Sequence, residues 1–225
     1  MMVKQKRATH WKPGKVISIS LRNGVYVLAQ MVRDPYLVFF NHFNEENNWK
    51  GVTLKEEDIL FCKAVTRQFL RYSSVTIVKN LEPLLDYGLP KEWIYSHIGG
   101  HPITVSVKGR ERQVAGFGRR CSLVLADKDS GQPEDNPLMG LFQAYIIPDI
   151  KEQDWERVGQ AEHMSIEVFP TLNERLYLCY LYGKNINPEQ DISLGKPLLD
   201  DYETYVDILT NSPEARRLYL GEYEE

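Results

Sequence analysis

The stretch from Trp11 to Asn41 constrains the fold most strongly, because short apolar runs alternate with strong turn signals along it. Pro13-Gly14 predicts a turn, since Pro presets its own φ and Gly tolerates the positive φ that follows. Asn23-Gly24 predicts a type I′ hairpin, because both residues accept the left-handed conformation that this turn requires. Asp34-Pro35 then ends the return strand. Three antiparallel strands are expected, at residues 16–21, 25–32 and 36–40, as in a curled sheet or SH3-like barrel.

The same stretch resembles a known family. The resemblance lies in the Trp-Lys-Pro-Gly opening at Trp11, the Asn-Gly-Val-Tyr hairpin at Asn23 and the Val-Phe-Phe strand at Val38. These features are similar to the immunity protein 26 family of bacterial polymorphic toxin systems, and the likeness covers roughly the N-terminal half of the chain. It implies an immunity protein that binds a cognate toxin domain in the cytoplasm and occludes or distorts its active site.

The charge of the chain is divided unevenly along its length. Through Ala126 there are 19 Lys and Arg against 10 Asp and Glu, whereas from Asp127 onward there are 8 against 21. The change of sign falls in Asp127–Pro137, a polar segment with Gly and two prolines that is typical of a linker. We therefore expect a basic β-rich domain at residues 1–126 and an acidic α+β segment at 138–225, or one continuous domain. The two halves could attract each other, or the acidic half could present a field to a basic partner.

The rest of the chain predicts a mixture of strands and helices. A capping-box pattern at Thr53–Glu56 predicts a helical turn through Asp58. Apolar runs predict strands at residues 59–65, 103–107, 121–125, 141–147, 165–169 and 176–182, and residues 69–78 could form a strand or a short helix. Helices are expected at residues 81–87, 200–209 and 213–220, the last begun by Ser212-Pro213. The expected fold class is α+β, mostly antiparallel β, with an N-terminal SH3-like curled sheet or barrel and C-terminal helices.

Cysteine spacing and the N-terminal sequence indicate the cellular compartment of the protein. Cys62, Cys121 and Cys179 lie far apart in apolar surroundings, so we expect three buried, reduced thiols. The basic N-terminus is not followed by the apolar run of a signal peptide, and no apolar stretch has the length of a membrane span. These observations predict a soluble, cytoplasmic protein.

No motif predicts a catalytic or metal site. His97 and His101 are four residues apart, but the glycines between them and Pro102 argue against the helix that a shared metal would need. Gly116–Arg120 could bind a phosphate through backbone N–H groups and arginines, although a basic β-turn is the simpler interpretation. We therefore expect no catalytic residues, no metal and no small-molecule cofactor.

Acidic residues of the second half are the candidate partner-binding residues. The candidates are Glu152, Asp154, Glu156, Asp200, Asp201 and Glu203. They could recognise a basic toxin domain such as a nuclease, or they could be ordinary solvated surface residues. No membrane partner is expected.

Two other functions stay open on the sequence alone. Basic and aromatic residues are interleaved near the N-terminus, at Lys4, Lys6, Arg7, Trp11, Lys12, Lys15, Arg22 and Tyr26. Small barrels with this pattern bind nucleic acids by base stacking and phosphate contacts. An enzyme of unrecognised type is the third alternative.

Overall fold

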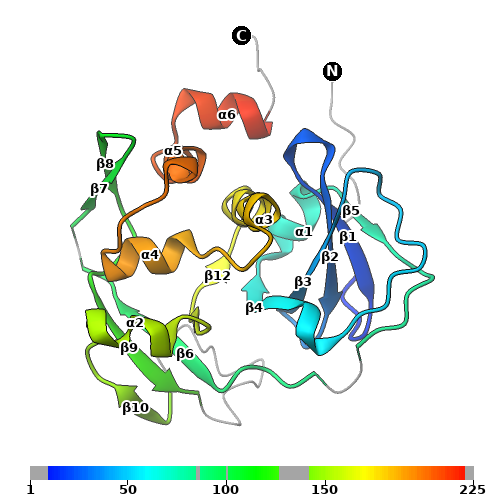
Figure 1. Ribbon diagram of the computed structural model, residues 1–225, viewed down its shortest axis with the longest axis horizontal. Helices are drawn as coiled ribbons and strands as arrows, with labels where there is room; N and C mark the ends of the chain where they lie inside the picture. The colour runs from blue at the N-terminus through cyan, green and yellow to red at the C-terminus, as the bar shows by residue number, and fades with distance from the viewer. Residues whose placement is uncertain (1–9, 85–86, 100, 127–141, 221–225) are drawn as a thin grey trace. The chain divides into compact units, whose positions relative to one another are not determined.

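The computed structural model describes residues 10–84, 87–99, 101–126 and 142–220. The fold is α+β, with 29% helix, 31% strand, a curled sheet rich in antiparallel pairs and helices at the C-terminus, which confirms the expected class. The chain divides into two compact units. Unit 1 comprises residues 1–88 and 166–185, and unit 2 comprises residues 89–165 and 186–225 (Figure 1).

Unit 1 is built on a six-stranded sheet with the order β12-β4-β3-β2-β1-β5. The strands are β1 (Val16–Ser20), β2 (Tyr26–Met31), β3 (Tyr36–Asn44), β4 (Ile59–Val65), β5 (Val75–Ile77) and β12 (Ile166–Glu167). All neighbours pair antiparallel except β12, which runs parallel to β4. The predicted meander of the first three strands is confirmed, and β3 extends four residues beyond its predicted end at Phe40.

The turn between β1 and β2 has the predicted geometry. Asn23 has φ 57° and ψ 25°, Gly24 has φ 75°, and Val25 N donates to Arg22 O at 3.4 Å. Two successive residues in the left-handed region, closed by this bond, form a type I′ turn. The Asn-Gly pair therefore sets the register from which the rest of the sheet is built.

Several local predictions in unit 1 need correction. The ambiguous residues 69–78 contain both elements, helix α1 (Arg67–Tyr72) and then strand β5. The turn η2 (Glu56–Asp58) forms, but its cap is Lys55 without a side-chain bond, so the capping box at Thr53 was wrong. The helix predicted at residues 81–87 is absent from its described part, 81–84 and 87. There the Gln30 side-chain amide bonds both the N–H and the C=O of Leu84, and this replaces helical hydrogen bonds.

The largest correction concerns residues 176–182, which were predicted to form a strand. They belong to helix α3 (Thr171–Tyr182), which Gly183 ends at φ 63°. Every residue from Thr171 to Cys179 is buried, so the helix lacks the polar face that would give a helical period. Its Tyr-Leu-Cys-Tyr run therefore has the composition of a buried strand. The neighbouring strand predicted at 165–169 is confined to β12.

Helix α3 brings charged side chains into the interior of unit 1. Glu174 is fully buried and accepts two hydrogen bonds from the Arg22 guanidinium, at 2.9 and 3.1 Å. Arg175 is 1% exposed, lies 3.7 Å from the centroid of the Phe61 ring and donates to Asn185 Oδ1. These contacts thus fix the position of the helix against β4 and the hairpin turn.

Unit 2 contains a four-stranded sheet, a separate hairpin and most of the short helices. The sheet order is β10-β9-β6-β11, and the hairpin pairs β7 with β8. The strands are β6 (Glu92–His97), β7 (Ile103–Val107), β8 (Arg110–Val114), β9 (Arg120–Leu125), β10 (Ala144–Ile147) and β11 (Glu162–His163). The helices are η4 (Glu152–Asp154), α2 (Trp155–Val158), α4 (Pro188–Leu194), η5 (Asp200–Tyr202), α5 (Glu203–Leu209) and α6 (Pro213–Leu220).

One face of the four-stranded sheet forms the core of unit 2. Ile94, Cys121 and Leu123 pack on Ile150 and Val158. The C-terminal helices confirm the prediction, and Ser212 Oγ caps α6 by accepting from Ala215 N at 3.2 Å. The sequence did not predict β6, β8, β11, α2 or α4.

The remaining expectations have mixed outcomes. The three cysteines are free and buried, as predicted. Among the described residues, no helix combines the length and the apolar character required to cross a membrane. The whole of the predicted linker, residues 127–137, lies outside the described residues. The two compact units divide the chain near residues 88, 165 and 185.

Candidate functional site

All six predicted partner-binding residues lie in unit 2, in two groups. The first group is on η4 and α2, where Glu152 and Glu156 are exposed and Asp154 is half-buried. Asp154 Oδ2 accepts from Lys151 N at 2.9 Å, so this carboxylate also holds the start of the turn. Two carboxylates of the first group are therefore presented to solvent.

The second group lies on η5 and the start of α5. Asp200 and Asp201 are exposed, whereas Glu203 is half-buried. Within unit 2, α4 lies between α2 and α5, so the two acidic groups occupy separate places (Figure 1). The structure does not bring the six predicted residues together into one surface.

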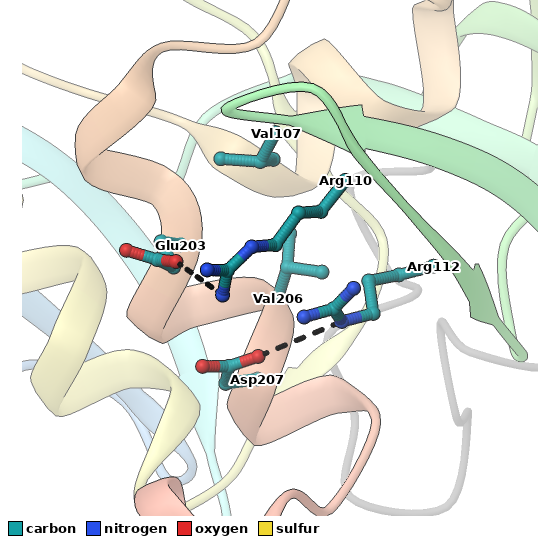
Figure 2. Close-up of a pocket in the computed structure, with 6 residues that line it drawn as sticks. All are labelled: Val107, Arg110, Arg112, Glu203, Val206 and Asp207. Carbon is teal, nitrogen blue, oxygen red and sulfur yellow. Dashed lines mark ion pairs between the residues drawn. The ribbon is translucent and has the colours of Figure 1, made fainter.

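The β7–β8 hairpin covers the acidic side of α5 (Figure 2). Lys108 Nζ lies 2.6 Å from Glu203 Oε2, Arg110 lies 3.6 Å from the other oxygen of Glu203, and Arg112 lies 3.9 Å from Asp207. Val107 and Val206 line the same shallow pocket. Lys108 and Gly109 both have positive φ, which gives the hairpin the tight turn that brings the basic side chains together.

These contacts change how the acidic groups titrate. The hydrogen bond from Lys108 lowers the pKa of the Glu203 carboxyl and raises the pKa of the Lys108 ammonium. Burial raises the pKa of Asp207, against the opposing effect of Arg112. Glu203 is thus engaged by the basic part of its own chain, which is the internal attraction that the charge division had suggested.

An aromatic row lies on the other face of the four-stranded sheet, opposite the core of unit 2. The ring centroids of Tyr95 and Phe142 are 5.3 Å apart, and those of Phe142 and Tyr145 are 4.8 Å apart. His97 meets Tyr95 edge to face at 4.9 Å. Tyr145 is 49% exposed, and Tyr95 and Phe142 are half-buried. We call Tyr95, His97, Phe142 and Tyr145 the aromatic row.

Charged residues of both signs surround the aromatic row. The cross-strand partner of His97 is Arg120, which is exposed. A hydrogen bond from Lys151 lowers the pKa of Asp149, and the charges of Arg120 and His97 lower it further. His97 Nε2 also lies 2.9 Å from Ser122 Oγ, which fixes the ring against the sheet. An apolar centre with a mixed polar rim is the composition of many protein-binding surfaces.

The aromatic row was missed by sequence reasoning. The available signal was the alternation of Trp93, Tyr95 and His97, which puts all three side chains on one face of a strand. Which face is open depends on the pairing of β6 with β9 and on the helices that cover the opposite face. Neither can be derived from residue spacing.

The residues of the Gly116–Arg120 segment, which the sequence offered as a phosphate site, have structural roles. Gly118 is required because a Cβ there would lie 2.1 Å from His97 O. Arg119 donates to the carbonyls of Ile192 and Thr104, so it is engaged in holding backbone together. No cluster of three or more His, Cys, Asp or Glu suited to a metal ion occurs among the residues that the structure describes.

A polar cluster lies beneath the aromatic row, on the core side of β6. Ser96 Oγ lies 2.9 Å from His163 Nδ1 and 3.5 Å from Cys121 Sγ. Cys121 and His163 are buried, and burial raises the pKa of the Cys121 thiol. A raised thiol pKa disfavours the thiolate that nucleophilic chemistry requires, so the contacts suit a structural role.

Part of the chain matches a known family model. Residues 5–101 match a family model described as a domain of unknown function (DUF8309). The matched span contains β1 to β6 and ends before the segment 166–185 that completes unit 1. No curated protein and no solved structure matches the chain.

Proposed function

We propose that this chain is an immunity protein that binds a cognate toxin domain and blocks it, with the aromatic row as the centre of the binding surface. The observation that carries the proposal is the partly exposed aromatic row with its rim of mixed charge. Tyrosine and arginine are the side chains most enriched among residues that dominate protein–protein affinity. Tyr95, Tyr145 and Arg120 lie on one face, and the paired strands β6 and β9 give that face a fixed geometry.

The second support is the resemblance of the N-terminal half to the immunity protein 26 family. An inhibitor of this kind needs a complementary surface and a fast encounter with its toxin. Glu152, Glu156 and Asp200 are exposed and could attract a basic domain over several ångströms before contact. The acidic residues would therefore steer the encounter, and the aromatic row would hold the complex.

The test is a binding measurement with the purified toxin candidate encoded beside this chain. Tyr95→Ala should weaken the complex by about 30-fold or more, as expected for a central aromatic anchor worth about 2 kcal/mol. Ile98→Ala is the matched control, because Ile98 is 65% exposed near the end of the same strand and lies outside the row. Equal affinity of both variants and the wild type would show that the toxin binds elsewhere.

The acidic residues have a separate kinetic test. Reversal of Glu152, Glu156 and Asp200 to Lys should slow association with a basic toxin and weaken its dependence on salt, because steering acts on the association rate. The dissociation rate should change less. Surface plasmon resonance at two ionic strengths measures both rates. An unchanged association rate would mean that the acidic residues serve only the chain itself.

A nucleic-acid-binding role is the second candidate, because bases stack on aromatic side chains exposed on a sheet. The aromatic row favours it, while Asp149 within the rim opposes a phosphate backbone. Retention of a labelled single-stranded oligonucleotide that falls steeply with salt and is lost in Tyr95→Ala would support this alternative.

A further inference from the structure

Strand β10 is the outer strand of the four-stranded sheet among the described residues. Its residues are Ala144, Tyr145, Ile146 and Ile147, and the first three are exposed. The sequence from Gln143 to Pro148 carries no charge. Natural sheets commonly protect an outer strand with charges or proline, because its free backbone groups can pair with another chain.

The register shows which backbone groups point outward. Ala126 N donates to Lys91 O, so the backbone groups of Ala126 and Val124 point toward β6. Those of Leu125 and Cys121 point the other way, as shown by the bonds that their carbonyls accept from Gln143 N and Ile150 N. Ala144 pairs with Leu125, and Tyr145 pairs with Val124. The N–H and C=O of Tyr145 therefore point away from β9, toward the open edge.

We propose that β10 is a self-association site at which a second copy of this chain adds its own β10 antiparallel. The two-fold axis would lie midway between the two strands, beside Tyr145. The outward N–H of each Tyr145 then donates to the C=O of Tyr145 of the partner subunit. The two phenol rings then form a cross-strand aromatic pair, and no like charges face each other, because the strand is uncharged. The pairing is closed, so it stops at a dimer.

The size of the strand sets the expected affinity. The register shift between Tyr145 and Ile147 leaves Ile146 as an extra residue in β10 and limits the length of regular pairing. A contact of this length is smaller than a standard protein interface, so we expect a dissociation constant on the order of 100 µM. Dimerisation goes beyond the proposed function, because binding of a toxin by one chain does not require it. The dimer would place two aromatic rows on one side of a continuous sheet.

The experiment is sedimentation equilibrium of the full chain from about 5 to 500 µM. The wild type should approach the mass of a dimer at the highest concentration. Tyr145→Pro removes the outward N–H and should weaken dimerisation by at least about 10-fold, whereas Tyr145→Val removes the same ring but keeps the N–H and should weaken it less. Ile98→Ser changes an exposed apolar residue elsewhere and should dimerise as the wild type does.

Amide exchange of the wild type provides a second measurement that needs no variant. Exchange at Tyr145 should slow as concentration rises, while exchange at Ala144, whose N–H faces β9, should stay constant. A monomeric mass at every concentration would overturn the proposal. So would assembly beyond a dimer, or equal dimerisation of Tyr145→Pro and Tyr145→Val.

Discussion

The two compact units differ in the surroundings of the ion pairs that join the basic part of the sequence to its acidic part. In unit 1, Glu174 is fully buried and forms a bidentate ion pair with Arg22. Lys63 is also buried, and its ammonium lies 3.6 Å from the carboxylate of Glu167. In unit 2, Lys108 and Arg110 meet Glu203 at a surface where each side chain is at least one third exposed. In each of these pairs the cation precedes Ala126 and the carboxylate follows Asp127.

The same division of charge has a different effect in each unit. A buried carboxylate and guanidinium are costly unless they meet, so they select one arrangement of α3 on the sheet. Exposed pairs contribute little to stability, because water and salt screen them. Part of the charge asymmetry of the sequence is thus neutralised within the molecule. Buried ion pairs do this in unit 1, and exposed, weaker ion pairs do it in unit 2.

The largest expected effect comes from Glu174→Ala. Loss of this carboxylate leaves the partly buried Arg22 without its partner and should lower the free energy of unfolding by about 3–5 kcal/mol. Denaturant unfolding measures it. The matched variant Glu203→Ala, in unit 2, should change stability little. Equal losses in the two variants would remove the contrast between the units.

The second effect tests the turn that sets the sheet of unit 1. Gly24→Val places a β-branched residue at φ 75° and should cost about 1–3 kcal/mol. Gly88→Val is the control, because Gly88 has neither positive φ nor a close neighbour. A Gly24→Val protein with the same melting temperature as the wild type would contradict the left-handed turn at this position.

The third effect is a pH dependence in unit 2. Burial holds the folded pKa of Cys121 above that of the unfolded thiol, which is about 8.5. The unfolded chain then releases the proton first, so this contribution to stability is complete below about pH 8.5 and falls as pH rises toward the folded pKa. Thermal melts at pH 7 and 9.5 should differ more in the wild type than in Cys121→Ala.

A thiol reagent should also modify all three cysteines only after denaturation.

The smallest effect concerns the hairpin on α5. The pKa of Glu203 is lowered in the folded state, so its contribution is present above the unfolded value of about 4.3 and disappears as pH falls through the lowered folded value. The protection factors of the amides of Ile103–Val107 and Arg110–Val114, which correct for the intrinsic pH dependence of exchange, should fall at low pH or high salt. Glu203→Gln should remove that dependence. Protection factors that do not change with pH or salt would show that Val107 and Val206 alone hold the hairpin.

The parts of the fold that the sequence predicted are those with local causes. Asn23-Gly24, Asp34-Pro35 and Ser212-Pro213 act within a few residues, so the meander and the last helix followed from them. Helix α3 did not, because burial on all sides removed its period. Strand β8 did not either, since Arg-Glu-Arg-Gln has no apolar alternation and depends on its hairpin partner.

The candidate site was harder to predict than the fold. The acidic residues were visible in the sequence, but their separation into two groups and the pairing of Glu203 depend on contacts between residues nearly 100 positions apart. The aromatic row joins Tyr95 to Tyr145 through the register of three strands. Long-range pairing of this kind leaves no local mark in a single sequence.

The return of residues 166–185 to unit 1 has a consequence for synthesis on the ribosome. When Gly88 has been made, β12 and α3 do not yet exist, so β4 lacks its parallel neighbour and Arg22 lacks Glu174. At about 5–20 residues per second, the nascent chain waits on the order of 5–20 s for residue 185. The N-terminal sheet must spend that interval incomplete, with apolar surface and an unpaired strand edge of the kind that chaperones bind.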